Sequence, residues 1–139
     1  MKKYEIKNII PTLEEYKYLC ESVGWTNYIN FEVVETSLRN SIHCITVMDN
    51  DQIVGMGRIV GDGAIYFYIQ DIVVHPEYQK NGIGNEIMNL LVEYLKTNAP
   101  DKAFVGLFAS QGKEPFYERY DFKNFSPNMT GMFTVISKK

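Results

Sequence analysis

The sequence predicts an α/β protein of the α+β kind, with a mixed, mostly antiparallel central sheet and about four flanking helices. Strand patterns between residues 42 and 74 follow one another with only short turns between them, which is typical of antiparallel neighbours. A helix then separates the strand at 64–74 from the next strand at 103–109, and such a crossover is nearly always right-handed and joins parallel strands. With 139 residues, 45% hydrophobic and 22% charged, the chain is expected to form one domain over residues 1–139.

The first forty residues are expected to form one strand and two helices. Residues 4–10 alternate apolar and polar side chains, and Pro11 ends that strand. Thr12 followed by Glu15 makes a capping box, which predicts a helix that begins there and ends at Gly24. A second, short helix is predicted by the helical spacing of the apolar residues Phe31, Val34 and Leu38.

Three strands are predicted in the middle of the chain, over residues 42–48, 52–60 and 64–74. The turns between them are rich in Asp, Asn and Gly, which favour tight turns. Pro76 ends the third strand, because proline has no N–H for the sheet ladder.

The best-defined helix begins near Gly84. Its apolar residues recur every three or four positions, and Pro100 follows its end. After this helix we expect a strand at 103–109, a short helix at 114–120 and a last strand at 131–137.

The composition argues against several classes of protein. A formal charge of −3 without a basic stripe argues against nucleic-acid binding, which needs a concentrated positive face. No apolar run approaches the roughly eighteen residues of a membrane helix, so we expect no membrane partner and a cytoplasmic protein. Cys20, Cys44, His43 and His75 have neither metal-type nor redox-type spacing, so no metal is expected.

Residues 79–84, Gln-Lys-Asn-Gly-Ile-Gly, carry the strongest functional signal. They join a buried strand to a helix without a side-chain cap, so the first N–H groups of that helix stay free for an anion, which the helix dipole also favours. Gly82 and Gly84 lack the Cβ atoms that would block a pyrophosphate. The pattern fits neither a Walker loop nor a Rossmann fingerprint, which needs a third glycine where Ile87 stands. For the glycine pair taken alone, a plain strand-to-helix turn is the alternative.

Around this turn the sequence resembles the GNAT superfamily of N-acetyltransferases. Gln79-x-x-Gly82-x-Gly84 matches the signature turn of the family, and residues 71–78 are similar to the strand that leads into it. Residues 114–122, with their Phe-Tyr pair, look like the second motif of the family.

The resemblance covers residues 52–133 and implies the GNAT fold, in which two parallel strands splay apart and the pantetheine arm of acetyl-CoA lies in the gap. Here the gap would lie between residues 72–74 and 106–109, where main-chain groups of Val73 and Val74 would pair with the pantetheine and an N–H near Val73 would face the oxyanion. Ser110 and Asp121 depart from the usual Asn and Gly, and the Ser110 hydroxyl would replace the Asn contact. The resemblance assigns to the cofactor Ile72, Val73, Val74, Gln79, Lys80, Asn81, Gly82, Ile83, Gly84, Asn85, Ser110 and Tyr117.

The implied reaction moves an acetyl group from acetyl-CoA to a primary amine by direct transfer in a ternary complex. The amine must first lose a proton, and neither cysteine lies near the motif to form an acyl-enzyme. By its match to the family, Tyr117 is expected to protonate the leaving thiolate. Asp71 is the expected base, since strand alternation puts it on the same face as Val73; Tyr68 and Glu32 are its rivals. The residues expected to contact the acceptor are Glu32, Tyr68 and Phe31.

Two other functions stay open on the sequence. The chain would also suit a non-catalytic acyl-CoA-binding or regulatory module, or an interaction domain whose glycines only shape a turn. The acidic residues favour a cationic small molecule such as a polyamine, an aralkylamine or an amino sugar, with peptide or protein amines as the alternative. The sequence decides neither the acceptor, nor the base, nor the use of other acyl groups. The last strand would allow a homodimer by edge pairing.

Overall fold

The sheet has five strands in the order β1-β2-β3-β4-β5, in a computed structural model that describes residues 4–138. The first four strands are antiparallel neighbours, and β5 is parallel to β4. The predicted mixed, mostly antiparallel sheet is therefore confirmed. The strands are β1 (Glu5–Lys7), β2 (His43–Asp49), β3 (Gln52–Gly61), β4 (Tyr66–Val74) and β5 (Phe104–Gly106).

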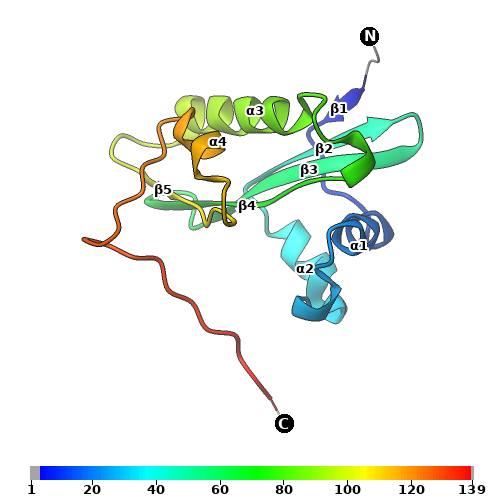
Figure 1. The fold of residues 1–139 in the computed structure, drawn as a ribbon, viewed down its shortest axis with the longest axis horizontal. Coiled ribbons are helices and arrows are strands. Elements are labelled where there is room, and N and C mark those ends of the chain that lie inside the picture. Colours follow the sequence, from blue (N-terminus) through cyan, green and yellow to red (C-terminus); the bar gives the residue numbers. More distant parts are fainter. Residues whose placement is uncertain (1–3, 139) are drawn as a thin grey trace. The chain divides into compact units, whose positions relative to one another are not determined.

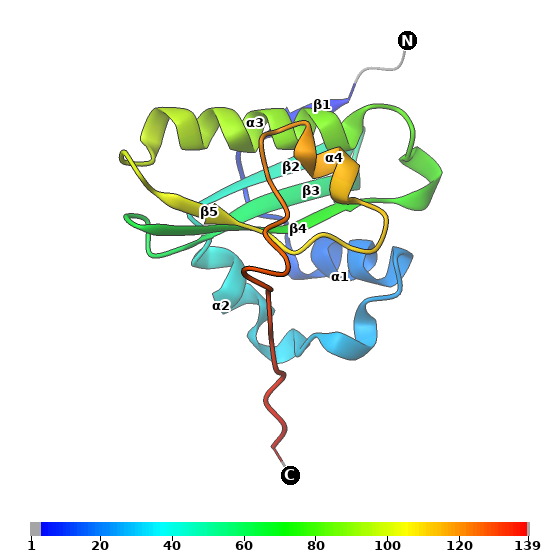
Figure 2. The ribbon, with the colours of Figure 1, turned by 60° about the vertical axis from the view of Figure 1, so that its left-hand side comes forward.

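Helices cover both faces of the sheet (Figures 1 and 2). α3 (Ile83–Asn98) lies on one face, and α1 (Leu13–Ser22) and α2 (Val34–Arg39) lie on the other. Within the described residues, none of the helices is long and apolar enough to cross a bilayer. Three short 3₁₀ helices complete this part of the chain: η1 (Thr26–Tyr28), η2 (Phe31–Val33) and η3 (Pro76–Tyr78).

The start of α1 follows directly from the sequence. The Thr12 hydroxyl accepts from the Glu15 N–H at 3.1 Å, and the Glu15 carboxylate accepts from the Thr12 N–H at 2.9 Å. These two bonds satisfy main-chain donors that the first turn of a helix otherwise leaves without partners. The expected capping box is confirmed.

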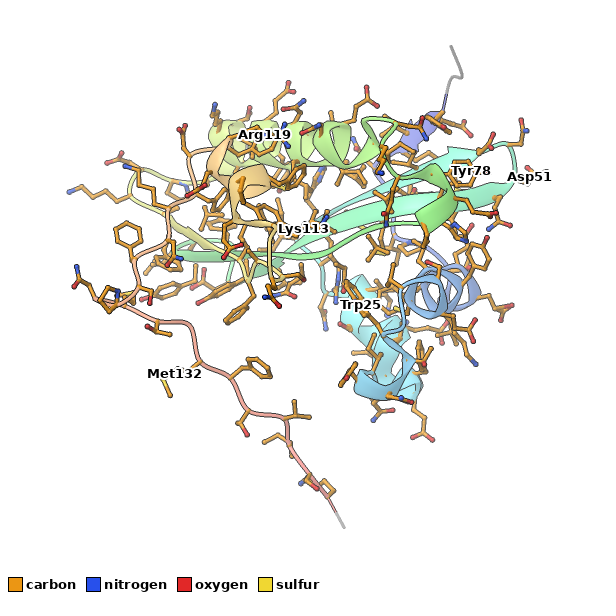
Figure 3. The ribbon with its side chains drawn as sticks, viewed as in Figure 1. Trp25, Asp51, Tyr78, Lys113, Arg119 and Met132 are labelled. Atoms are coloured by element: carbon orange, nitrogen blue, oxygen red, sulfur yellow. The ribbon has the colours of Figure 1, made fainter. Side chains whose placement is uncertain are left out.

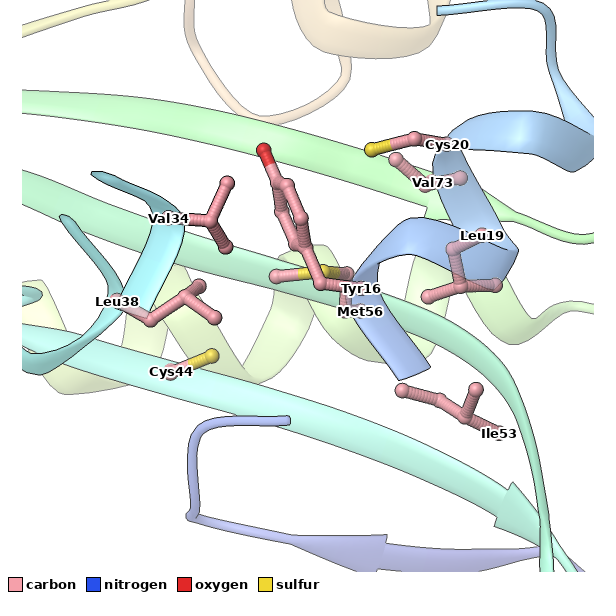
Figure 4. Close-up of a cluster of buried hydrophobic side chains, with 9 residues drawn as sticks. All are labelled: Tyr16, Leu19, Cys20, Val34, Leu38, Cys44, Ile53, Met56 and Val73. Carbon is pink, nitrogen blue, oxygen red and sulfur yellow. The ribbon is translucent and has the colours of Figure 1, made fainter. Parts of the chain in front are cut away.

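Side chains from α1, α2 and three strands form the core on the α1 and α2 face (Figure 4). Leu19, Ile53 and Met56 have no exposed surface, and each such burial contributes roughly 1.5–3 kcal/mol. The core cluster comprises Tyr16, Leu19, Cys20, Val34, Leu38, Cys44, Ile53, Met56 and Val73.

A close approach between α3 and β3 forms the core on the other face. A Cβ atom on Gly57 would lie 2.5 Å from Ile87 Cγ2 and 2.6 Å from Ile72 Cδ1, so a larger residue would push these side chains apart. The His43 ring of β2 also stacks on the Tyr94 ring of α3, with centroids 4.0 Å apart. These contacts hold α3 against β2 and β3.

β4 contains a β-bulge beside Asp71. Between the pairs Met56–Val73 and Arg58–Gln70, β4 has one residue more than β3. Asp71 has a φ of 57°, in the left-handed region, which aspartate adopts more readily than most residues with a side chain.

The bulge reverses the alternation of β4 side chains between the α3 face and the face of α1 and α2. Before it, Ile69 lies opposite Ile59, which shares the α3 face with Gly57. After it, Val73 packs in the core cluster of α1 and α2. In a regular strand Ile69, Asp71 and Val73 would share one face, because side chains alternate. The extra residue thus brings Asp71 to the α1 face and keeps its carboxylate out of the apolar core under α3.

β4 and β5 pair over a short stretch only. The pairs are Tyr66–Phe104, Phe67–Val105 and Tyr68–Gly106, and β5 ends there instead of reaching residue 109 as predicted. β4 continues to Val74. Within residues 4–138, the part of β4 beyond Tyr68 has no pairing with β5, so the main-chain groups along one of its edges have no partner strand there.

The first compact unit ends at Gly106, and a second unit begins at Leu107. In the second unit α4 (Glu114–Glu118) confirms the predicted short helix, and Figure 3 labels Lys113 and Arg119 at its two ends. A single domain over all 139 residues stays a prediction.

The prediction of a last strand over residues 131–137 is wrong. In the described chain these residues belong to no strand, and Met132 and Phe133 are 87% and 82% exposed. Figure 3 labels Met132 in this segment. A run of Phe, Thr, Val and Ile has a local preference for extended backbone, but a strand also needs a neighbour for its main-chain hydrogen bonds.

Candidate functional site

The turn before α3 ends in an open space beside a glycine. Gly82, the N-cap of α3, has a φ of 81°, and a Cβ added there would meet nothing within 4 Å. Among the described residues no side chain caps α3, and the Glu86 N–H makes the first helical bond, to the Gly82 carbonyl at 3.0 Å. The N–H groups of Ile83 and Gly84 precede that bond. Together with the positive end of the helix dipole they form a seat for an anion.

The side chains of the turn hold its backbone in place. Gln79 Nε2 donates to the Val74 carbonyl at 3.0 Å, and Asn81 Nδ2 donates to the Tyr78 carbonyl at 3.0 Å. The Tyr78 hydroxyl donates to Asp49, at the end of β2, at 2.9 Å. Figure 3 shows Tyr78 at this end of the sheet. The turn is therefore tied both to β4 and to the β2–β3 hairpin.

The last residues of β4 direct alternate main-chain groups to its two edges. The His75 N–H donates to the Val54 carbonyl of β3 at 2.8 Å. Main-chain groups two residues apart point the same way along a strand, so those of Val73 also face β3. The groups of Ile72 and Val74 face the opposite edge, beyond the last pair of β4 with β5.

Asp71, the expected base, lies in a largely buried ion pair. Its Oδ2 accepts from Arg58 Nε at 2.7 Å and from the Tyr16 hydroxyl at 3.2 Å. The side chains of Arg58 and Asp71 are 9% and 13% exposed. Arg58 also donates to the Ser37 carbonyl, the Ser37 hydroxyl and the Ser41 hydroxyl, each at 3.0 Å. Burial, and then the charge of Asp71, raise the pKa of Tyr16 far above its usual range, so this phenol keeps its proton.

A cavity of about 230 Å³ opens next to this network. Tyr16 and Arg58 belong to both the network and the wall of the cavity. Most of the other residues in the wall come from the segment between α1 and the end of α2. The lining residues are Tyr16, Tyr28, Ile29, Asn30, Val33, Val34, Ser37, Leu38 and Arg58.

The three residues predicted to contact the acceptor lie outside the lining of this cavity. Phe31 is partly buried against the core cluster, and Glu32 is exposed. The Tyr68 ring packs beside that of Phe104, with centroids 6.1 Å apart. Asn30 and Val33, next to Phe31 and Glu32 in the chain, do line the cavity, and contact of the three predicted residues with an acceptor stays a prediction.

Arg58 and Tyr16 were not predicted as site residues. A single charge within the apolar strand at 52–60 was the available signal, since a buried charge needs a partner. Its partner Asp71 is set by the strand register. Tyr16 has the helical spacing of a core residue, and it is one, but its hydroxyl also reaches Asp71.

Tyr117 and Ser110 belong to the second unit. Tyr117 lies on α4, and its ring meets that of Phe116 edge-on, with centroids 5.0 Å apart. Burial raises the pKa of the Tyr117 phenol, so the group is protonated at neutral pH and can donate. The Ser110 carbonyl accepts from the Lys113 N–H at 2.9 Å. Contact of Tyr117 or Ser110 with a cofactor stays a prediction.

The sheet order, the bulged β4 and the glycine turn before α3 define a protein of the acetyltransferase class with the GNAT fold. The chain matches the family model described as acetyltransferase (GNAT) domain over residues 12–132, and it belongs to that family.

Relatives and solved structures agree with this assignment. The protein named uncharacterized N-acetyltransferase ycf52 from Pyropia yezoensis is 30% identical over 131 residues, 91% of this chain and 72% of that protein. A protein of unknown function from Staphylococcus aureus is 30% identical with a TM-score of 0.89, over 96% of this chain and 100% of that one. A GNAT family acetyltransferase from Streptococcus pneumoniae is 31% identical with a TM-score of 0.76, over 99% of this chain and 100% of that one.

Both cysteines are expected to resist alkylation in the folded protein. Burial raises the pKa of Cys20 to about 11 and that of Cys44 to about 12, and only the thiolate reacts. At pH ~8, near the pKa of an ordinary thiol, iodoacetamide should leave the native protein unlabelled and add two labels to the urea-unfolded chain. Intact mass spectrometry measures the labels. Fast labelling of the native protein would contradict the burial of these thiols.

Proposed function

We propose that this protein is an acetyl-CoA-dependent N-acetyltransferase that acts on a small primary amine by direct transfer in a ternary complex. The observation that carries the proposal is the open start of α3 at Gly82, which no side chain of the described residues caps and which follows β4, a strand with one edge that has no partner strand beyond Tyr68. Membership of the GNAT family supports it. Acetyl-CoA would supply an acetyl group activated as a thioester.

The turn fits the diphosphate of such a cofactor. The main-chain N–H groups of residues 82–84 would hold it, with the positive end of the helix dipole behind them. The exposed Lys80 would add a positive charge. Gln79 already donates to the Val74 carbonyl at the end of β4 and Asn81 to the Tyr78 carbonyl, so their part is to shape the turn.

The unpaired edge of β4 would bind the pantetheine arm as an added strand. The main-chain groups of Ile72 and Val74 face that edge, whereas those of Val73 face β3. The Val74 carbonyl already accepts from Gln79 Nε2. We therefore assign the hydrogen bonds to the main-chain groups of Ile72 and to the N–H of Val74, where the resemblance alone pointed to Val73 and Val74.

Two side chains are proposed to move protons. Tyr117 would protonate the leaving thiolate, and its raised pKa keeps the phenol protonated where the acceptor amine begins to lose its proton. Asp71 would accept the proton of the amine. Its Oδ2 is engaged by Arg58 and Tyr16, so this role falls to Oδ1.

The cavity beside Arg58 favours an amine with a compact, mainly apolar body. Ile29, Val33, Val34 and Leu38 give it apolar walls, and its polar groups are two phenols, an amide, a hydroxyl and the ion-paired Arg58. Glu32 and its neighbour Glu35 are exposed and lie outside the lining. An alkylamine or aralkylamine therefore suits the cavity better than a polyamine or an amino sugar.

Replacing Gly82 by Asp should weaken CoA binding more than about tenfold relative to replacement by Asn. Both side chains tolerate the left-handed backbone and enter open space, so the fold should survive in each. Only the Asp side chain adds a negative charge, which at ~4 Å from another near a protein surface costs about 4 kcal/mol. Calorimetry with CoA measures the two affinities. Equal values for Gly82→Asp and Gly82→Asn would remove the diphosphate from this turn.

Tyr117→Phe should lower kcat by roughly 10²–10⁴ and change the KM for acetyl-CoA far less, because it removes the proton donor and keeps the aromatic ring. A thiol-release assay with acetyl-CoA and an accepted amine measures both constants. Tyr120→Phe, in the same unit, is the matched control and should keep wild-type turnover. If Tyr117→Phe turns over as fast as this control, another group is the acid.

An acceptor screen with thiol release and mass-spectrometric detection of the product should favour compact apolar amines. Their kcat/KM should exceed that of polyamines and amino sugars by about tenfold, the worth of some 1.4 kcal/mol of apolar contact. A preference for polyamines would contradict the use of this cavity. Saturable CoA binding without turnover of any amine would instead favour a non-catalytic acyl-CoA-binding module.

A further inference from the structure

We infer that Arg58 is a positioning residue: by holding Asp71 in its left-handed bulge, it sets the edge of β4 that Ile72 and Val74 offer to the cofactor. This inference rests on the proposed function, because that edge is proposed to bind acetyl-CoA. It gives the buried charge of Arg58, which lies outside the glycine turn, a defined part in cofactor binding.

The bulge lies where β4 changes its neighbours. Before it, β4 pairs with β3 and with β5 as far as Tyr68; after it, β4 pairs within the described chain with β3 alone. Asp71 stands between these parts with a φ of 57°. A bulge bends a strand and increases its twist, so the direction of residues 72–74 depends on the backbone of Asp71.

Arg58 is itself held in place by α2 and the residues that follow it. Three of its N–H bonds go to the Ser37 carbonyl, the Ser37 hydroxyl and the Ser41 hydroxyl, each at 3.0 Å. Its Nε donates to Asp71 at 2.7 Å. The planar guanidinium donates in several directions at once, so it has little room to rotate. Its Nε therefore offers the Asp71 carboxylate a donor in a fixed position.

The carboxylate needs this partner in order to stay where it is. The side chain of Asp71 is 13% exposed, and a charge with so little access to water must be paired. Without Arg58 the carboxylate would turn toward water and release the backbone. A residue with a Cβ atom populates the left-handed form about tenfold less than the right-handed one.

The same network borders the proposed acceptor cavity. Tyr16 donates to the oxygen that Arg58 holds, and both residues line the cavity. A proton acceptor at Asp71 alone would change turnover and leave CoA affinity as it is. A positioning role changes CoA affinity as well, so binding separates the two roles.

Four variants test the inference. Asp71→Asn keeps an acceptor for Arg58 and tolerates the left-handed backbone, whereas Asp71→Ala does neither. Arg58→Met removes the donor. The double variant Arg58→Met/Asp71→Gly removes the ion pair but lets glycine adopt the bulge freely.

Two controls match these changes away from β4. Asn50 has a φ of 56° in the β2–β3 turn, so Asn50→Ala applies the same backbone strain elsewhere. Arg39 is an exposed arginine of α2 that donates to Thr36, so Arg39→Met removes an arginine without touching the bulge. Circular dichroism and thermal melting establish that each variant is folded.

The CoA affinities measured by calorimetry should rank the variants by how readily residue 71 adopts the left-handed backbone conformation. We expect about tenfold weaker binding for Asp71→Ala and for Arg58→Met, the population ratio of the two backbone forms. Asp71→Asn and the double variant should bind within about threefold of the wild type. Asn50→Ala should melt earlier and Arg39→Met should melt as the wild type does, and both should bind CoA as the wild type does. If Arg58→Met does not fold, the Asp71 variants and Asn50→Ala decide.

Wild-type affinity in Asp71→Ala would overturn the inference, and so would a double variant that binds no better than Arg58→Met. Equal losses in Asn50→Ala and Asp71→Ala would also overturn it, because strain anywhere would then suffice. A wild-type protein that does not bind CoA would refute the proposed function itself. Wild-type binding that these changes leave unaltered would refute only the role of Arg58.

Discussion

Strand β4 pairs with β3 on one side and with β5 on the other, over different lengths. One extra residue in β4, beside Asp71, allows this difference in pairing. Up to Tyr68 the strand pairs on both sides, and beyond the bulge it keeps β3 and has a free edge toward the β5 side within the described residues. A regular strand would carry Asp71 into the apolar core under α3. The bulge turns the carboxylate to the other face, where Arg58 and Tyr16 bond it.

Both faces of the sheet depend on the same central strands. On one face the bare backbone of Gly57 lets α3, the helix that begins at the Gly82 turn, approach β3 closely. On the other face Met56 and Val73, an opposed pair of β3 and β4, pack beneath α1 and α2. The anion seat at α3 and the cavity beside α2 thus stand on opposite sides of one pair of strands, and the Arg58 network lies on the cavity side.

Local chemistry accounts for what could be predicted of this fold. The capping box of Thr12 and Glu15, the turns between strands and the helical spacing after Gly84 involve residues a few positions apart, and each is seen in the structure. The prediction of a last strand was wrong because a strand, unlike these features, depends on residues far away in the chain. Residues 131–137 have the side chains of a strand, but a strand exists only with a neighbour, and the segment itself does not specify one.

In the candidate site, too, some features follow from residues adjacent in the chain and others depend on the tertiary structure. The sequence by itself determined the glycine turn, the uncapped start of α3 and the strand that leads into it, because these follow from residues adjacent in the chain. Only the tertiary structure decided that Asp71 is paired with Arg58, that Ile72 and Val74 face the free edge, and that Asn30 and Val33 rather than Phe31 and Glu32 line the cavity. Strand register and one bulge set those facts, and a shift of a single residue would reverse each facing side chain, which no local pattern records.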